Sequence, residues 1–208
     1  MSNNHQDWTM NKKQKRIWND CHSLLMSVLS EKDVPAIYDK AVDRWRDFSS
    51  KMDHESDSRK NMAVDSILPR VALYAVLKEN GYPAEQIMTK YVEEIAGPAM
   101  HAKYAGMERI PGFFSIYRRI FMLYTDRSDW WECSSEKTPD GFKLDIHKCL
   151  WKDCCDVVGY PEVCRFFCDC DDITYGGLHK VGFKRTRTLG KGGDHCDFEF
   201  YRKPTEKG

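Results

Sequence analysis

The residue types that could do chemistry gather in the last third of the chain. Eight of the nine cysteines lie between Cys133 and Cys196, and the same stretch contains the carboxylate pair Asp171 and Asp172 and the basic run that begins at Arg185. Thiols, carboxylates and guanidinium groups can together supply a nucleophile, activate water or clamp an anion. We therefore expect the functional site in this part of the chain.

The segment around Arg185 alternates as a β-strand does, from about residue 181 to residue 189. Four residues of the same parity share one face of this strand: Val181, Phe183, Arg185 and Arg187. Because an arginine that continues an apolar face needs an anion, Arg185 predicts a partner, either Asp171 or Asp172 or the carboxylate of a ligand held in bidentate fashion. The alternative is that the end of the strand leaves the core and both arginines are solvated.

A second strand follows, from Cys196 to Arg202, after the glycine-rich loop 190–194. The two strands form a predicted β-hairpin, and Cys196 shares a face with Phe198 and Phe200. This position favours a core thiol, since free cysteine packs as a small hydrophobe. A reactive thiol would need a positive neighbour to lower its pKa, and His195 or an arginine across the hairpin could supply one.

The other cysteines are compatible with two further kinds of site. One is a metal site, and the other is a thiol with a histidine beside it as general base. Cys164 and Cys168 are four residues apart on a predicted helix and share one face, with Cys149 upstream. The chain has no Cys-x2-Cys pair, the spacing on which structural zinc sites usually draw. His147, on the polar face of its strand, could act as a general base near Cys149, although a single strand histidine is more often a surface residue.

Composition narrows the classes of function. Lysine plus arginine equals aspartate plus glutamate at 32 each, so no overall positive field would attract nucleic acid or a membrane surface. The longest apolar stretch, residues 111–124, is too short and too charged to span a membrane, and the polar segment 1–16 lacks the apolar run of a secretory signal. We therefore expect a cytoplasmic protein with reduced thiols, and the oligomeric state stays open, a homo-oligomer included.

The expected fold class is α+β. Apolar residues recur at helical spacing from Gln14 to about Met122, with Asp33 as a cap of the second helix and a break or kink at Gly97. Beyond Trp131 the period changes to that of strands, as in Phe142, Leu144 and Ile146. We expect a helical N-terminal region, 1–128, packed on a cysteine-rich region, 129–208, that holds a small antiparallel sheet and short helices.

Several short motifs then point to a family. They are Cys149-Leu150-Trp151-Lys152-Asp153-Cys154, Gly159-Tyr160-Pro161-Glu162-Val163-Cys164, Phe167-Cys168-Asp169-Cys170-Asp171, and the hairpin from Arg185 to Phe198. In order and spacing the chain resembles the L-2-amino-thiazoline-4-carboxylic acid hydrolases, over roughly Cys149 to Phe200. The resemblance implies hydrolysis of a small anionic heterocycle at an amidine-like carbon, giving N-carbamoyl-L-cysteine, a reaction of cysteine metabolism that needs no cofactor.

The resemblance also implies roles for particular residues. Arg185 would clamp the substrate carboxylate, and Asp171 would be the general base or the partner of the amidine. Three thiols would line the pocket, with one possible nucleophile among them: Cys149, Cys168 and Cys196. Further substrate contacts would come from Thr188, His147 and Asp197, the last of which could also orient Arg185.

Two other classes of function remain compatible with these residues. One is a non-catalytic domain that binds or senses a small molecule in the same pocket, which tight binding without product would reveal. The other is a structural module stabilised by zinc through the cysteines, which elemental analysis would detect.

Overall fold

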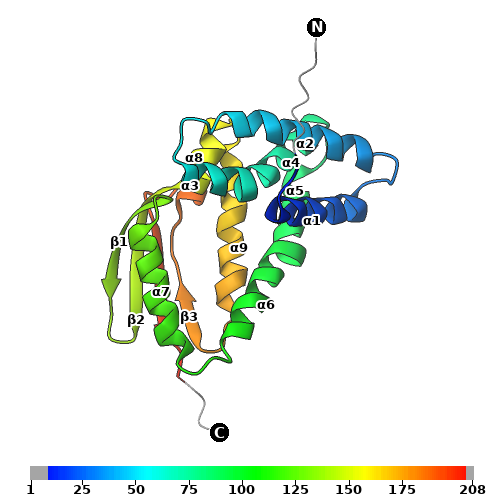
Figure 1. Ribbon diagram of the computed structural model, residues 1–208. Helices are drawn as coiled ribbons and strands as arrows, with labels where there is room; N and C mark the ends of the chain where they lie inside the picture. The colour runs from blue at the N-terminus through cyan, green and yellow to red at the C-terminus, as the bar shows by residue number, and fades with distance from the viewer. Residues whose placement is uncertain (1–8, 205–208) are drawn as a thin grey trace.

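The computed structural model describes residues 9–204 (Figure 1). The segment predicted as a polar cytoplasmic start falls partly on residues 1–8, which lie outside the described residues. The helices are α1 (Lys12–Val28), α2 (Val34–Ser50), α3 (Asp57–Met62), α4 (Leu68–Glu79), α5 (Ala84–Tyr91), α6 (Gly97–Met107), α7 (Phe113–Arg127), α8 (Leu150–Val157) and α9 (Cys164–Gly176). Between residues 9 and 204, no helix combines the length and the apolar character needed to cross a membrane.

Local sequence explains where several helices begin and end. Asn11 starts α1 through a capping box, in which its side chain accepts hydrogen bonds from the backbone of Lys13 and Gln14. Gly81, at a φ of +78°, follows α4 in the left-handed conformation that the sequence predicts. The prediction for Asp33 is only half right: it stands at the cap of α2, but its side chain accepts from Ser30 Oγ (2.6 Å) and not from the helix backbone.

Two helices continue through π-helical turns where a proline would otherwise interrupt them. One turn, η1 (Ala63–Ile67), joins α3 to α4 ahead of Pro69, and the other, η2 (Val92–Ala96), joins α5 to α6 ahead of Pro98. Proline lacks the N–H that would bond to the carbonyl four residues earlier, and a wider turn accommodates that loss. The expected break at Gly97 is therefore a π turn within a continuous helical segment.

The C-terminal half holds a four-stranded antiparallel sheet in the order β1-β2-β4-β3. The strands are β1 (Trp131–Lys137), β2 (Gly141–Cys149), β3 (Val181–Lys184) and β4 (Cys196–Arg202). β2 and β4 agree with the predicted strands, whereas β1 was not predicted. The strand expected over 181–189 is wrong beyond Lys184, because the chain leaves the sheet and forms a short 3-10 turn, η4 (Leu189–Lys191).

Helix α9 connects the two halves and sets the position of the site. In Figure 1 it runs through the middle of the molecule, with the sheet on one side, α6 on the other and α7 across the sheet. Its first turns, with Cys164 and Phe166, pack into the core of the helical half. Its last turns, with Tyr175, pack with Phe142 and Phe200 on the inner face of the sheet. The fold is α+β, as predicted, while the boundary at residue 128 stays a prediction.

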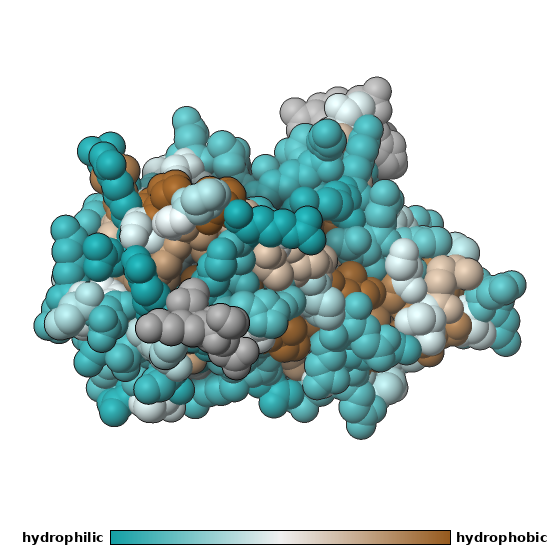
Figure 2. Space-filling model, turned by 90° about the horizontal axis from the view of Figure 1, so that it is seen from below, coloured by the Kyte–Doolittle hydropathy of each residue, from teal (hydrophilic) through white to brown (hydrophobic). Residues whose placement is uncertain are grey.

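Not all apolar side chains are covered. Figure 2 shows hydrophobic residues among hydrophilic ones on the surface seen from below. Among the described residues, α6 and α7 account for many of the exposed large hydrophobic side chains, which include Met100, Met107, Ile116, Ile120 and Leu123. The helix α7 is therefore held to the sheet mainly by one face.

Candidate active site

The centre of the candidate site is the guanidinium of Arg185, directly after β3. Its side chain is 4% exposed, and Nη2 donates hydrogen bonds to Asp172 Oδ2 (2.6 Å) and to the backbone oxygen of Cys168 (2.8 Å). The rings of Phe183 and Phe198 lie 5.7 and 5.5 Å from its Cζ atom. Nη1 has no hydrogen-bond partner among the described residues. The buried arginine therefore keeps one nitrogen available to an anion.

Asp171, on α9, is the acidic partner of Arg185. Its Oδ2 lies 3.7 Å from Nη1 of Arg185, within ion-pair range but beyond a hydrogen bond. Burial raises the pKa of Asp171 to about 7; the Arg185 charge acts against this rise, and the Asp172 charge adds to it. The carboxyl side chain nevertheless keeps 37% of its surface exposed, so water can reach it. A carboxyl that titrates near neutrality and contacts solvent can act as a general base.

One face of α9 lines the site. Residues separated by four, three and four positions share this face: Cys164, Cys168, Asp171 and Tyr175. Because α9 runs to Gly176, this face continues to Tyr175, which packs in the core of the sheet half.

The structure brings the three predicted pocket thiols together. Cys168 comes from α9, Cys149 from the end of β2, and Cys196 from the start of β4, and the three are close enough to influence one another's pKa. The backbone N–H of Leu189 donates to Cys196 Sγ (3.2 Å). All nine cysteines, which lie within the described residues, are free thiols.

These thiols are poor nucleophiles at neutral pH. Burial raises the pKa of Cys149 to about 12 and that of Cys196 to about 11. A hydrogen bond with Cys164, and then burial, raises the pKa of Cys168. Because the thiolate is the reactive form, the three side chains stay protonated and unreactive here.

Gly190 shows how tightly the loop closes on the thiols. A Cβ atom at this position would lie 2.8 Å from Cys168 Sγ and 3.0 Å from Cys164 Sγ. We expect Gly190→Ala to lower the melting temperature by displacing the loop from α9. Gly106→Ala is the control, because a Cβ there meets nothing within 4 Å and alanine favours the helix. Equal melting temperatures for the two variants would contradict this packing.

Thr188 and Asp197 organise the loop between β3 and β4. The Thr188 hydroxyl caps η4 by accepting from the backbone of Lys191 (3.1 Å), and it also hydrogen-bonds with Cys168. Asp197 accepts from the backbone N–H groups of Thr186 (2.9 Å) and Arg187 (2.8 Å). The structure thus uses Asp197 to shape the loop, and among the described residues Asp197 forms neither a hydrogen bond nor an ion pair with Arg185.

A β-bulge separates His147 from the other predicted residues. The pairing of β1 with β2 matches Cys133 with Ile146 and Glu132 with Lys148, so His147 is the extra residue. His147 is exposed, and its ring lies 5.7 Å from that of His195. The bulge shifts the alternation by one residue, which puts Cys149 on the inner face and leaves His147 outside.

A hollow of about 400 Å³ opens beside Arg185. Residues 185–188 and 191–193 line it, together with Asp172. Its charged groups are Arg185, Arg187 and Lys191 against the single carboxylate, which suits an anionic ligand. Lys191, which sequence reasoning missed, forms an ion pair with Asp169 (2.6 Å).

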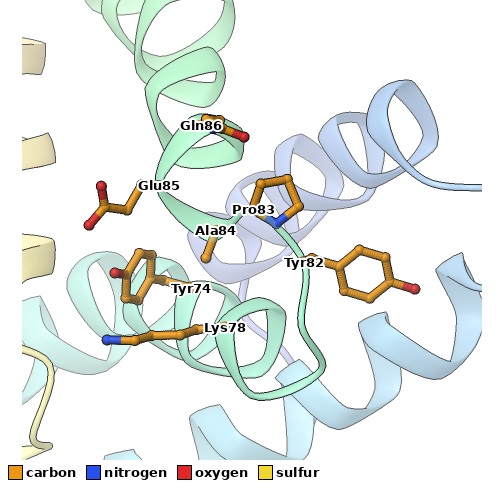
Figure 3. Close-up of a pocket in the computed structure, with 7 residues that line it drawn as sticks. All are labelled: Tyr74, Lys78, Tyr82, Pro83, Ala84, Glu85 and Gln86. Carbon is orange, nitrogen blue, oxygen red and sulfur yellow. The ribbon is translucent and has the colours of Figure 1, made fainter.

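A second hollow, of about 310 Å³, lies at the start of α5 (Figure 3). It is lined by residues 82–86 and by Tyr74 and Lys78 of α4, as the figure shows. Lys78 is engaged in an ion pair with Glu162 (2.7 Å). None of the predicted site residues lines this hollow.

Metal binding was one alternative for the cysteine-rich region. Within residues 9–204, no group of three or more His, Cys, Asp or Glu side chains has an arrangement that could hold a metal ion.

Comparison with known protein families gives a match over more than half of the chain. A search of the curated proteins gave no match. The sequence model of the L-2-amino-thiazoline-4-carboxylic acid hydrolases matches residues 59–200, a stretch that contains α9, the whole sheet up to Phe200, and all of the site residues described above. The chain therefore belongs to the L-2-amino-thiazoline-4-carboxylic acid hydrolase family.

Proposed function

We propose that the protein is a cofactor-independent hydrolase that opens a small carboxylate-bearing heterocycle, as in the conversion of L-2-amino-thiazoline-4-carboxylate to N-carbamoyl-L-cysteine. One observation carries the proposal: Arg185 is buried, and its Nη1 atom makes no hydrogen bond among the described residues but lies 3.7 Å from a carboxyl whose pKa is about 7. The pair offers an anion clamp next to a base. Membership of the family supports this substrate class.

The proposed chemistry uses these two groups in sequence. Arg185 holds the substrate carboxylate, and ionised Asp171 takes a proton from a water molecule as its oxygen attacks the amidine carbon. The attack moves the electron pair of the C=N bond to the ring nitrogen, and this pair re-forms the bond as the carbon–sulfur bond of the tetrahedral intermediate breaks. The proton held by Asp171 passes to the sulfur, and the hydroxyl proton moves to the ring nitrogen to give the carbamoyl group. A thiol of pKa about 8.5 is a fair leaving group, so the departing sulfur needs little further help.

Direct attack by water is favoured over attack by a cysteine. A neutral thiol with a pKa of about 11, as in Cys196, is less than one part in a thousand ionised at pH 7. Asp171 is about half ionised at the same pH. Reduced thiols are usual in the cytoplasm, where we place the reaction.

The choice of nucleophile can be tested with Cys196→Ala. We expect kcat to stay within about threefold of the wild-type value, because the thiol packs against the loop and takes no part in bond making. A loss of a thousandfold or more in kcat, with an unchanged melting temperature, would establish the thiol as nucleophile. Cys21→Ala, in the helical half, controls for the effect of removing any buried thiol.

The function itself is tested by incubation of the purified protein with L-2-amino-thiazoline-4-carboxylic acid. N-Carbamoyl-L-cysteine should appear by mass spectrometry at the same rate as free thiol by a colorimetric reagent. Tight binding without product would favour the ligand-binding reading. Neither product nor binding would reject this substrate.

A further inference from the structure

Helix α7 leaves an apolar stripe uncovered on the side that faces away from the sheet. Four side chains of the stripe are 44% to 60% exposed: Ile116, Ile120, Leu123 and Tyr124. Their spacing of four, three and one positions puts them on one face of the helix, which Figure 1 shows as an outer layer over the sheet. Seven of the nine exposed large hydrophobic side chains among the described residues lie within 100–124. A surface helix normally has polar residues on its outer face, so the stripe is typical of a docking surface.

The apolar surface continues beyond both ends of α7. After the helix, the ring of Tyr124 packs against Trp130 (5.3 Å between centroids) and Trp131 (6.0 Å), which are both half-buried. Before the helix, Met107 and Ile110 are exposed. A stable interface covers about 800 Å² on each partner, which needs such an extended surface. Tyrosine, tryptophan and arginine are also the residues that contribute most to binding in protein interfaces.

Two opposite charges lie along one edge of the stripe. Arg119 and Asp126 are seven residues apart, which is about two helical turns, and both side chains are exposed. Asp126 accepts a hydrogen bond from Ser135 Oγ (3.2 Å), and neither residue forms an ion pair with another residue that the structure describes. This edge of the stripe therefore has a positive end and a negative end.

We propose that the stripe on α7 is the interface of a homodimer, in which α7 of a second copy of this chain packs antiparallel on the same face. A two-fold axis between Ile120 and Leu123 places each of these side chains against the other one in the second copy. The same axis brings Arg119 of each copy beside Asp126 of the other, so two ion pairs form. Arg127 continues the stripe at its end, where its long side chain can reach solvent.

The charges favour a second copy over a lipid surface. An anionic membrane would attract Arg119 but repel Asp126, whereas a copy rotated by 180° pairs both residues. None of the residues of the stripe lines either hollow, so the inference does not depend on the proposed function.

The first test is the oligomeric state of Ile120→Glu. Sedimentation equilibrium of the wild type should give twice the chain mass of 24.3 kDa. We expect Ile120→Glu to raise the Kd of the dimer at least about 100-fold, because it puts two carboxylates at the centre of the interface. Met26→Glu is the control, since Met26 is 46% exposed on α1, outside the stripe, and its replacement should leave the Kd unchanged. A monomeric wild type, or a dimer that persists in Ile120→Glu, would overturn the inference.

A charge exchange tests the antiparallel arrangement. Arg119→Asp should raise the Kd of the dimer about tenfold or more, because both ion pairs become repulsive contacts. Adding Asp126→Arg should restore the Kd to within about threefold of the wild-type value, since the pairs re-form with their signs reversed. A double variant as weak as Arg119→Asp would overturn the arrangement. Binding of a monomeric wild type to phosphatidylserine vesicles would overturn the inference as well, because it would assign the stripe to a membrane surface.

Discussion

Asp171→Asn is expected to reduce kcat by about a thousandfold, within the range that a positioned general base contributes. The amide preserves the shape of the side chain but cannot accept the proton of the attacking water. Substrate binding should change little, because Arg185 keeps its hydrogen bonds to Asp172 and to the Cys168 carbonyl. The measurement is steady-state kinetics with the carboxylate substrate, and a kcat within tenfold of wild type would exclude Asp171 as the base.

The pH dependence of kcat/KM is an independent test of Asp171 as the general base. A base must be ionised, and Asp171 has a raised pKa of about 7, so kcat/KM of the wild type should fall as pH drops below about 7. Asp172→Asn is the matched control. The charge of Asp172 raises the pKa of Asp171, so its removal should move the acidic limb to lower pH while kcat at its plateau is kept.

The stability of the folded protein should also depend on the ionisation of Asp171, but it should fall as the pH rises, whereas kcat/KM should increase. The pKa of Asp171 is about 7 in the folded protein against 3.8 in the reference state, so its protonated form favours folding. This contribution is complete below about pH 4 and is lost as the pH rises through 7. Relative to Asp171→Asn, the wild type should therefore lose stability between pH 4 and 7. Because 37% of the side chain is exposed, solvent screens the effect, and we expect about 1 kcal/mol. A constant difference in melting temperature would contradict the raised pKa.

The sequence predicts the burial of some side chains near the candidate site and misses the arrangement of others. Alternation correctly placed Phe142, Leu144 and Ile146 on a buried face, because a strand covered on one side must alternate. The rule also holds for His147, which is exposed, but it cannot be extended to Cys149, since a bulge shifts the alternation and pairing partners cannot be read from one strand. It failed at Arg185, which is buried as predicted, but by α9 and not by a continued strand.

Tyr117 illustrates a further limit. Its position on the buried face of α7 follows from helical periodicity, but nothing in the sequence says which element that face covers. Only the packing of α7 on Phe142 and Phe200 brings the ring to the inner face of the sheet. The partners of a side chain depend on contacts between distant segments, which local patterns do not encode.

The remaining large effect is expected at Arg185. In Arg185→Lys we expect KM for the carboxylate substrate to rise about 100-fold, since the ammonium replaces the planar guanidinium and a charge-assisted hydrogen bond contributes about 1.5 to 3 kcal/mol. The lysine can still pair with Asp172, which should keep the loop in place. Arg185→Ala should raise KM further and also lower the melting temperature, because it leaves two carboxylates beside an empty volume.

The control for charge is Arg187→Ala. Arg187 lines the same hollow, but its side chain is 51% exposed and pairs with Asp194 at the surface (3.3 Å). Such a pair contributes little, so KM should change less than threefold. For 2-amino-2-thiazoline, the wild type and Arg185→Lys should have similar KM values, because the compound has no carboxylate to clamp. A KM for the carboxylate substrate that depends on Arg187 and not on Arg185 would move the clamp to the solvent-exposed side of the hollow, away from Asp171.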